Sequence, residues 1–188
     1  MKKIFSLFAV VFMAMCMFAE PVTLTFKDWG DTDPKSATDS TPKNQAGDDG
    51  TAYTTANIKD SIEGADFLDT VTVATKLYAA RVGYGCKLGS SKAIGKFVAN
   101  LATPAQFDSI VFVASSYSTS EGSVKVCGGE VIDLTNDSTD NKVLKRLVYE
   151  PTGTVDSISF ETTVKRAYLK SIIFYPAAGS TGGSDPVT

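Results

Sequence analysis

The sequence of 188 residues predicts an all-β protein built as a β-sandwich. Short runs rich in β-branched and aromatic residues recur at intervals of roughly ten residues from Val71 to Tyr175, as they do in sandwiches. Gly, Ser and Asp separate these runs, as is typical of turns. Within most runs apolar and polar side chains alternate, which is the period of a half-buried strand. No internal repeat is visible, and we expect one domain of two antiparallel sheets.

The first element, residues 1–19, has the pattern of a secretory signal peptide. Two lysines precede an apolar run that is too short to span a bilayer, and Ala19 offers a cleavage site before Glu20. A lipid anchor at Cys16 is the alternative, but the preceding residues lack the small side chain that such processing prefers. We therefore expect cleavage and export, to the periplasm, the cell surface or the medium.

Residues 20–176 are then the sandwich domain, and its elements follow in order. Val22 to Phe26 alternates and predicts a first strand. Residues 31–57 form a long polar loop, and Asn57 to Asp69 predicts only a helical turn or two, because Gly64 interrupts a short pattern. Val71, Val73, Thr75 and Leu77 then share one face, and further strands are expected in YGCKLGSS, GKFVANL, FDSIVFVAS, GSVKVC, EVIDL, KVLKRLVYE, VDSISFE and RAYLKSIIFYP.

Two of these elements are more specific than the others. FDSIVFVAS is apolar on both faces between Ile110 and Ala114, which indicates a central strand. SVKVCGGEVIDL predicts a hairpin closed by a two-residue turn at Gly128-Gly129, because both glycines can take positive φ. Residues 177–188, AAGSTGGSDPVT, form a Gly/Ser-rich linker or tail that favours tethering to a partner domain.

Composition excludes several kinds of chemistry. The chain has no histidine, so Ser-His and Cys-His nucleophiles and His-ligated zinc are excluded. Paired carboxylates or a calcium-dependent reaction remain, but no motif unites the acids Asp66, Asp69, Glu121 and Glu130, and we expect no catalytic activity. The net charge is −3 with lysines scattered singly, so we expect no nucleic-acid partner, and no amphipathic basic segment suggests a membrane surface.

Three stretches, YGCKLGSSKAIGKFVANL, FDSIVFVASSY…GSVKVCGGEVIDL and ISFETTVKRAYLKSIIFYP, resemble the galactose-binding-like jelly-roll modules of secreted bacterial proteins. The resemblance covers about Leu77 to Tyr175. Many members of that superfamily are carbohydrate-binding modules attached to glycan-degrading enzymes. The resemblance therefore implies a jelly-roll sandwich and a non-catalytic module that binds glycan. Its common acidic calcium-binding pattern is not matched by DWGDTDP, and no pair of sugar-stacking aromatic residues aligns.

Candidate ligand-binding residues are aromatic and polar side chains at expected strand ends. A sugar packs its apolar face on an aromatic ring and offers hydroxyls to polar groups, so we select Trp29, Asp31, Tyr84, Tyr117 and Arg166. Tyr53 is a further candidate at a strand end. The alternative for each aromatic residue is core or rim packing, and the alternative for Arg166 is simple exposure on a strand. Tyr149, Tyr168 and Tyr175 lie in strands and are expected to be structural.

A calcium ion and a disulfide are left open. Five aspartates could supply calcium ligands, although turn formation in water is the favoured interpretation: Asp28, Asp31, Asp33, Asp48 and Asp49. A Cys86–Cys127 bridge would close a loop of about forty residues. Strand parity opposes it, because Cys86 is in phase with the inward Leu88 and Cys127 with the outward Lys125.

The leading functional hypothesis is an exported, non-catalytic binding module for glycan, tethered to a partner domain. The alternative is a structural or adhesive cell-surface sandwich that binds protein, which an exposed apolar patch would favour. A small carbohydrate-active enzyme that uses two carboxylates is the third hypothesis.

Overall fold

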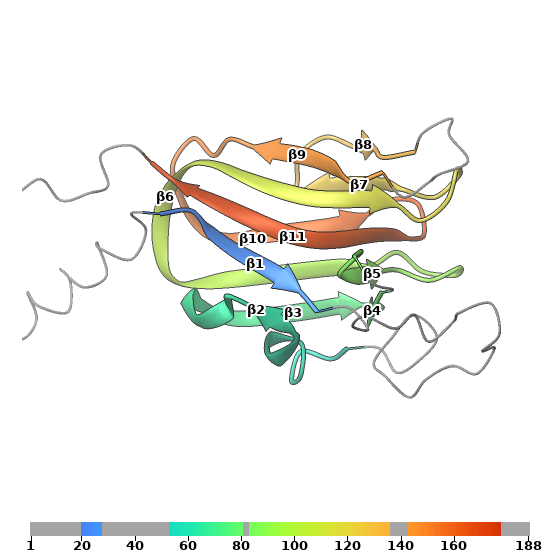
Figure 1. Ribbon diagram of the computed structural model, residues 1–188, viewed down its shortest axis with the longest axis horizontal. Helices are drawn as coiled ribbons and strands as arrows, with labels where there is room; N and C mark the ends of the chain where they lie inside the picture. Colours follow the sequence, from blue (N-terminus) through green and yellow to red (C-terminus); the bar gives the residue numbers. More distant parts are fainter. Residues whose placement is uncertain (1–19, 28–52, 81–82, 136–142, 178–188) are drawn as a thin grey trace, which may run out of the picture.

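The computed structural model describes residues 20–27, 53–80, 83–135 and 143–177, which form a sandwich of two antiparallel β-sheets (Figure 1). The predicted all-β sandwich of two antiparallel sheets is confirmed. The signal peptide, Trp29, the five aspartates named above, most of the polar loop and residues 178–188 lie outside the described residues. Within the described residues, no helix is long and apolar enough to cross a membrane.

The first sheet has the strand order β2-β1-β11-β6-β9, and β5 pairs with β11 alongside β1, with β4 beyond β5. Every pairing is antiparallel. Its strands are β1 (Val22–Phe26), β2 (Ile62–Glu63), β4 (Leu77–Ala79), β5 (Cys86–Leu88), β9 (Lys145–Tyr149), β11 (Ala167–Pro176) and the second half of β6 (Lys96–Ser116).

The second sheet has the order β3-β6-β10-β7-β8 and uses the first half of β6. Its other strands are β3 (Leu68–Thr75), β7 (Ser123–Val126), β8 (Ile132–Asp133) and β10 (Thr154–Thr162). In the described part of the chain between β1 and β3, the helical segments are two single-turn 3-10 helices on either side of β2, η1 (Lys59–Ser61) and η2 (Ala65–Phe67), as the interruption at Gly64 predicted.

Strand β6 differs from the sequence prediction, which expected two separate strands in GKFVANL and FDSIVFVAS. The structure has one strand of 21 residues that belongs to both sheets. Ala102 to Pro104 are exposed and form a bend between Leu101 and Ala105, which both pair within the second sheet, and pairing with β11 of the first sheet begins at Phe107. Because this bend needs few ladder hydrogen bonds, it accepts a proline that would disrupt a central position. The second half is central, with β11 and β9 on its two sides, as Ile110 to Ala114 predicted.

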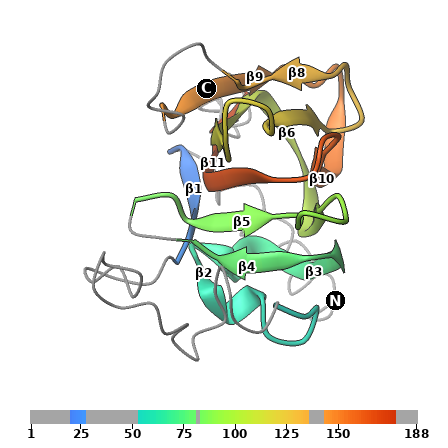
Figure 2. The same ribbon diagram turned by 90° about the vertical axis from the view of Figure 1, so that its right-hand side faces the viewer.

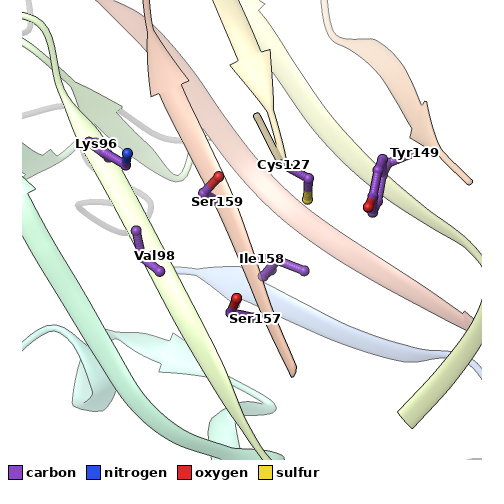
Figure 3. A pocket seen from close by; sticks show the side chains of 7 residues that line it. All are labelled: Lys96, Val98, Cys127, Tyr149, Ser157, Ile158 and Ser159. Carbon is purple, nitrogen blue, oxygen red and sulfur yellow. The ribbon is translucent and has the colours of Figure 1, made fainter. Parts of the chain in front are cut away.

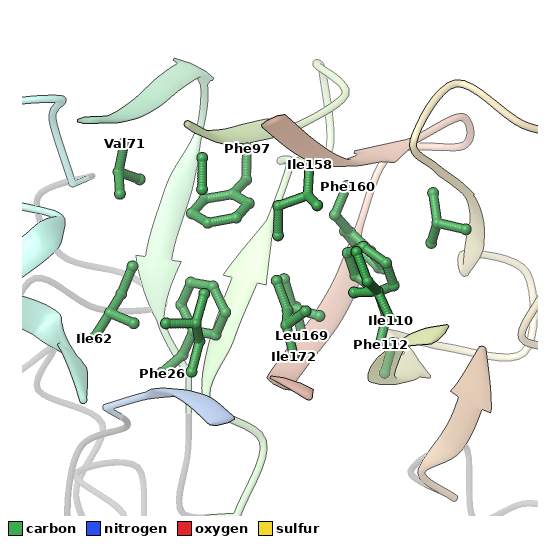
Figure 4. Packing of buried hydrophobic residues seen from close by; sticks show 14 of the residues in the cluster. Phe26, Ile62, Val71, Phe97, Ile110, Phe112, Ile158, Phe160, Leu169 and Ile172 are labelled. Atoms are coloured by element: carbon green, nitrogen blue, oxygen red, sulfur yellow. The ribbon is translucent and has the colours of Figure 1, made fainter. Parts of the chain in front are cut away.

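The core lies between the two sheets and is rich in aromatic side chains (Figure 4). Two ring contacts join one sheet to the other. Phe26 meets Phe97 edge-on at 5.2 Å between centroids, and Phe112 stacks on Phe160 at 6.0 Å. Alternation along each strand therefore places one face in this core and the other on an outer surface.

The β7–β8 hairpin has its turn one residue earlier than predicted. Positive φ occurs at Cys127 (48°) and Gly128 (72°), and Gly129 donates the closing hydrogen bond to the carbonyl of Val126 at 2.9 Å. Both cysteines are free thiols: Cys86 is fully buried, as its parity predicted, and Cys127 is half-buried at the hairpin tip. They lie on different sheets, so the bridge left open by the sequence is not formed.

One end of the sandwich carries the connections β4–β5, β5–β6, β6–β7 and β10–β11 (Figure 1, right). Figure 2 looks directly onto this end, with β4 and β5 toward the viewer. Strand β11 begins here at Ala167 and runs to Pro176 at the opposite end. We call this end the loop end.

Candidate functional site

Four side chains form a row across the outer face of the first sheet at the loop end. Tyr78 of β4 pairs with Lys87 of β5, Lys87 with Tyr168 of β11, and Tyr168 with Ser115 of β6. Their strand neighbours, such as Leu88, lie in the core. Since side chains alternate along a strand, the row faces away from the core.

Two tyrosines from the connecting segments pack on Tyr168. The ring centroid of Tyr84 lies 5.2 Å from that of Tyr168, and the ring centroid of Tyr117 lies 5.5 Å from that of Tyr168. Tyr168 is only 2% exposed, whereas Tyr84 and Tyr117 are half-buried. Two residues selected from the sequence therefore meet over a third tyrosine, each with part of its surface open to solvent.

The guanidinium of Arg166 lies over the ring of Tyr117, with 3.8 Å between its carbon and the ring centroid. Its Nε donates to one oxygen of Glu121 at 2.6 Å and a terminal nitrogen donates to the other at 2.9 Å. This two-point ion pair fixes the plane of the guanidinium. Arg166 is thus held against Tyr117, unlike the arginine simply facing water that the sequence left as an alternative.

Glu121 is nearly buried and receives a second cation, because Lys165 Nζ lies 3.6 Å from its Oε1. The hydrogen bonds from Arg166 lower the pKa of the Glu121 carboxyl, and the charges of Arg166 and Lys165 act in the same direction, against a smaller effect of burial. Glu121 is therefore an anchored carboxylate that is poorly suited to act as a general acid.

The ammonium of Lys87 lies near two aromatic rings, 4.7 Å from the centroid of Tyr78 and 5.8 Å from that of Tyr117. Lys87 is 5% exposed, and cation–π attraction offsets part of the cost of burying its charge. We call the following residues the tyrosine–cation cluster: Tyr78, Tyr84, Lys87, Tyr117, Glu121, Arg166 and Tyr168.

A buried hydroxyl lies beside the cluster. Ser115 pairs with Tyr168 in the row and is fully buried, and its Oγ has no hydrogen-bond partner among the described residues. Buried hydroxyls nearly always have a hydrogen-bond partner, so the Ser115 hydroxyl is a hydrogen-bonding group that the described side chains do not use.

Two glycines let the connecting segments approach the cluster. Gly85 has φ +73°, and a Cβ there would lie 2.5 Å from the carbonyl oxygen of Leu169, next to Tyr168. Gly89 has φ +82°, and its Cβ would overlap the carbonyl oxygen of Lys165. Both positions require a positive φ and have no space for a side chain, and glycine satisfies both conditions. Gly85 therefore allows the segment of Tyr84 to lie close to β11, and Gly89 allows the Lys165–Arg166 segment to lie close to the end of β5.

The structure brings together three of the five selected residues, Tyr84, Tyr117 and Arg166. Trp29 and Asp31 lie outside the described residues. Tyr53 packs against the hydrophobic core, as its alternative interpretation held. Sequence reasoning missed Tyr78 and Lys87, which become neighbours only through the register of β4 and β5.

The other candidate acids do not join Glu121. Asp66 lies in η2, Asp69 in β3 and Glu130 at the β7–β8 hairpin. Across the described parts of the chain, no group of three or more Cys, Asp or Glu side chains is arranged to hold a metal ion. The five aspartates proposed for calcium lie outside those parts.

A hollow opens on the other sheet, beside β10 (Figure 3). Its volume is about 310 Å³, within the range of ligand sites. Tyr149 is its one aromatic residue, and Lys96 beside it is paired with Glu161 at 3.3 Å. The hollow is lined by Lys96, Val98, Cys127, Tyr149, Ser157, Ile158 and Ser159. It has fewer aromatic faces than the tyrosine–cation cluster, which is therefore the stronger candidate site.

The described chain is thus a β-sandwich with an aromatic and cationic site at its loop end. No protein-family model matches the chain, and no curated protein matches it. Solved structures with a similar fold are carbohydrate-binding modules.

One of these structures is a variant of a family 29 carbohydrate-binding module made to probe ligand recognition. It is 14% identical, covers 65% of this chain and 90% of its own, and has a TM-score of 0.38. A low-affinity xylan-binding module of family 86 from the gut symbiont Roseburia intestinalis is 18% identical over 62% of this chain and 94% of its own, with a TM-score of 0.34. CpGH89CBM32-6 from Clostridium perfringens is 14% identical over 60% of this chain and 95% of its own, with a TM-score of 0.35.

Proposed function

We propose that this protein is a non-catalytic module that binds carbohydrate at the tyrosine–cation cluster. The observation that carries the proposal is the gathering of the half-buried tyrosines Tyr78, Tyr84 and Tyr117 beside fixed hydrogen-bond donors. A pyranose ring has an apolar face that packs on an aromatic ring, while its hydroxyls require polar partners. The cluster offers both kinds of contact within one small area of the surface.

The contacts within the cluster also support binding. Arg166 is fixed by Glu121 and stacks on Tyr117, and Tyr117 and Tyr84 both rest on the buried ring of Tyr168. Side chains that are ordered before binding lose less conformational entropy when the ligand arrives. The cluster is therefore a preorganised surface.

Export and tethering belong to the same proposal. Residues 1–19 direct export and are removed, and residues 177–188 tether the domain to a partner. The cluster lies at the start of β11, whereas Pro176 ends that strand at the other end of the sandwich (Figure 1). A tether that leaves the domain at Pro176 lets the cluster face away from the partner domain. The tether also raises the effective concentration of the partner domain at a polymer surface to which the module binds. Mass spectrometry of secreted protein should find Glu20 at the N-terminus; a retained Met1 or a lipid on Cys16 would contradict this.

The test measures retardation of the protein in native gels that contain soluble polysaccharides, followed by calorimetry. We expect Tyr117→Ala and Tyr84→Ala to weaken binding about tenfold or more, equivalent to about 1.4 kcal/mol, while the melting temperature changes little. Tyr175→Ala is the matched control. Tyr175 is a partly exposed tyrosine near the far end of β11, where its hydroxyl accepts a hydrogen bond from Arg146 at 3.2 Å. The Tyr175→Ala substitution should leave glycan binding unchanged.

If the native protein binds no member of a broad glycan panel, the proposal fails. It also fails if both Tyr117→Ala and Tyr84→Ala bind like the native protein. Release of sugar by the purified domain, abolished by a change at one carboxylate, would instead support an enzyme.

One surface favours the adhesive alternative. Val143, Leu144 and Val148 are 50%, 36% and 56% exposed, and they lie along or just before β9, whose described partner is β6 alone. Exposed apolar residues in a group are typical of protein contacts. Val148→Lys would abolish binding of a protein partner or self-association without affecting glycan binding, which separates the two functions.

A further inference from the structure

The charges of the chain are distributed unevenly. The sequence has 21 acidic and 18 basic residues, yet it has no Asp or Glu between Asp69 and Asp108. The same interval contains five basic residues, Lys76, Arg81, Lys87, Lys92 and Lys96. Within an acidic protein this interval is therefore locally cationic, and it contains β4, β5 and their connection to β6.

The fold adds a second basic segment to the first. Gly89 of the β5–β6 connection donates a hydrogen bond to the carbonyl of Lys76 and approaches the carbonyl of Lys165. Lys165, Arg166 and Lys170 of the β10–β11 region are therefore brought to the same end of the sandwich as the basic residues of segment 76–95. In the described residues of segments 76–95, 117–122 and 163–170 there is a single carboxylate, Glu121, and the cations are Lys76, Lys87, Lys92, Lys165, Arg166 and Lys170. Lys96 is set apart, because it pairs with Glu161 on the other sheet.

We propose that the tyrosine–cation cluster selects acidic polysaccharides, whose sugars carry carboxylate or sulfate groups. This inference rests on the proposed function and names the ligand class of the same site. Six cations against one carboxylate create a positive potential on a chain whose net charge is −3. Such a potential attracts an anionic polymer and is screened by salt.

Individual side chains indicate how an acidic sugar is held. Lys87 Nζ lies within 6 Å of both Tyr78 and Tyr117, so a pyranose stacked on either ring brings its anionic substituent near this ammonium. Lys165 is 53% exposed, and its 3.6 Å contact with Glu121 is a surface ion pair of small energy, so its ammonium can turn toward a ligand. Arg166 keeps its two bonds to Glu121 and serves as the support of Tyr117.

A nucleic acid is the competing polyanion. Nucleic-acid grooves follow a phosphate backbone over several nucleotides with a continuous stripe of cations. Here six cations gather at the loop end with one carboxylate, whereas the basic residues elsewhere, such as Lys59 and Lys125, are outnumbered by acidic residues. A long polyphosphate would meet repulsion beyond the cluster, whereas a few acidic sugars fit within it.

The experiment compares polygalacturonate with its fully methyl-esterified form, which has the same backbone without the charge. Binding by the full chain is measured at low and physiological salt, with dextran sulfate to distinguish sulfate from carboxylate and a single-stranded oligonucleotide as the competing polyanion. We expect the charged polymer to bind at least about tenfold more tightly than its ester at low salt, and the difference to shrink as salt rises.

Two variants locate the effect. Lys87→Met keeps most of the aliphatic stem and removes the charge, and Lys165→Gln makes the same test at an exposed position where folding is not at risk. Each should weaken binding of the charged polymer severalfold. Lys165 lies outside the cluster, so Lys165→Gln should leave binding of a neutral glycan unaffected, whereas Lys87→Met should weaken binding of the charged polymer more than binding of a neutral one. The control is Lys125→Gln, on the outer face of the other sheet, which should change nothing.

The outcomes separate this inference from the proposed function. Equal binding of polygalacturonate and its ester, or stronger binding of neutral glycans, overturns the acidic selectivity while the carbohydrate module stands. Binding of the oligonucleotide as tightly as the acidic glycans overturns it in favour of nucleic acid. If no polysaccharide is bound at all, both proposals fail.

Discussion

Glu121→Gln tests whether the ion pair with Arg166 holds the cluster together. The Glu121 side chain is 8% exposed and the Arg166 side chain 21% exposed, so the pair is largely but not completely removed from water. The substitution replaces one acceptor oxygen by an amide nitrogen, which cannot accept from arginine, and it removes the negative charge. One of the two hydrogen bonds at 2.6 and 2.9 Å is lost, and the other becomes weaker.

Hydrogen bonds to charged groups contribute about 1.5–3 kcal/mol each, and the remaining exposure of Arg166 reduces that figure. We therefore expect the free energy of unfolding to fall by about 2 kcal/mol. For a domain of this size the melting temperature should fall by about 4–8 °C. Since Arg166 then loses its fixed position over Tyr117, glycan affinity should fall as well.

Urea unfolding followed by circular dichroism measures the change. The matched control is Glu161→Gln, whose partner Lys96 lies 3.3 Å away with 41% of its side chain exposed, and it should cost less than about 0.5 kcal/mol. A double-mutant cycle with Arg166→Met should show coupling of about 1–2 kcal/mol between Glu121 and Arg166. If Glu121→Gln is as stable as Glu161→Gln, the ion pair does not support the site and the reasoning is refuted.

Acid should remove the stability that the Glu121–Arg166 ion pair contributes. The folded pKa of Glu121 lies below its ordinary 4.5, so the pair stabilises the fold above pH 4.5, and this stabilisation is lost as the pH falls through the lower folded pKa. In unfolding experiments at decreasing pH, the difference in stability between the native protein and Glu121→Gln should therefore disappear. Phe97→Ala should cost about 3–5 kcal/mol in urea unfolding, because the ring is fully buried; a loss below about 1 kcal/mol would contradict the described core. Gly85→Ala should lower the melting temperature, because its φ of +73° and the carbonyl of Leu169 oppose a side chain. A maleimide should label Cys127 in the native protein and Cys86 only after denaturation, because Cys86 is fully buried and burial raises the pKa of its thiol well above the ordinary value. Equal labelling of the two cysteines in the native protein would contradict the burial of Cys86.

Local sequence pattern was sufficient for much of the fold. Leu24 and Phe26 alternate with polar residues and are buried in β1, and the doubly apolar run from Ile110 to Ala114 lies at the centre of the first sheet. Such predictions succeed because the side-chain period of a strand depends on the backbone alone and not on its partner. Tyr84, Tyr117 and Arg166 could be selected in the same way, because residues at strand ends are the ones that connecting segments expose.

Tertiary structure decided how those residues meet. Arg166 finds Glu121 at a separation of 45 residues, and Tyr78 meets Lys87 only because β4 and β5 pair in one register. A shift of that register by one residue would turn Lys87 into the core. The sequence likewise predicted two separate strands in GKFVANL and FDSIVFVAS, but β6 continues through the exposed residues Ala102 to Pro104 and on into the other sheet. Register and strand continuity depend on hydrogen bonds between segments far apart in the chain, whereas the alternation that the sequence displays is a property of each segment alone.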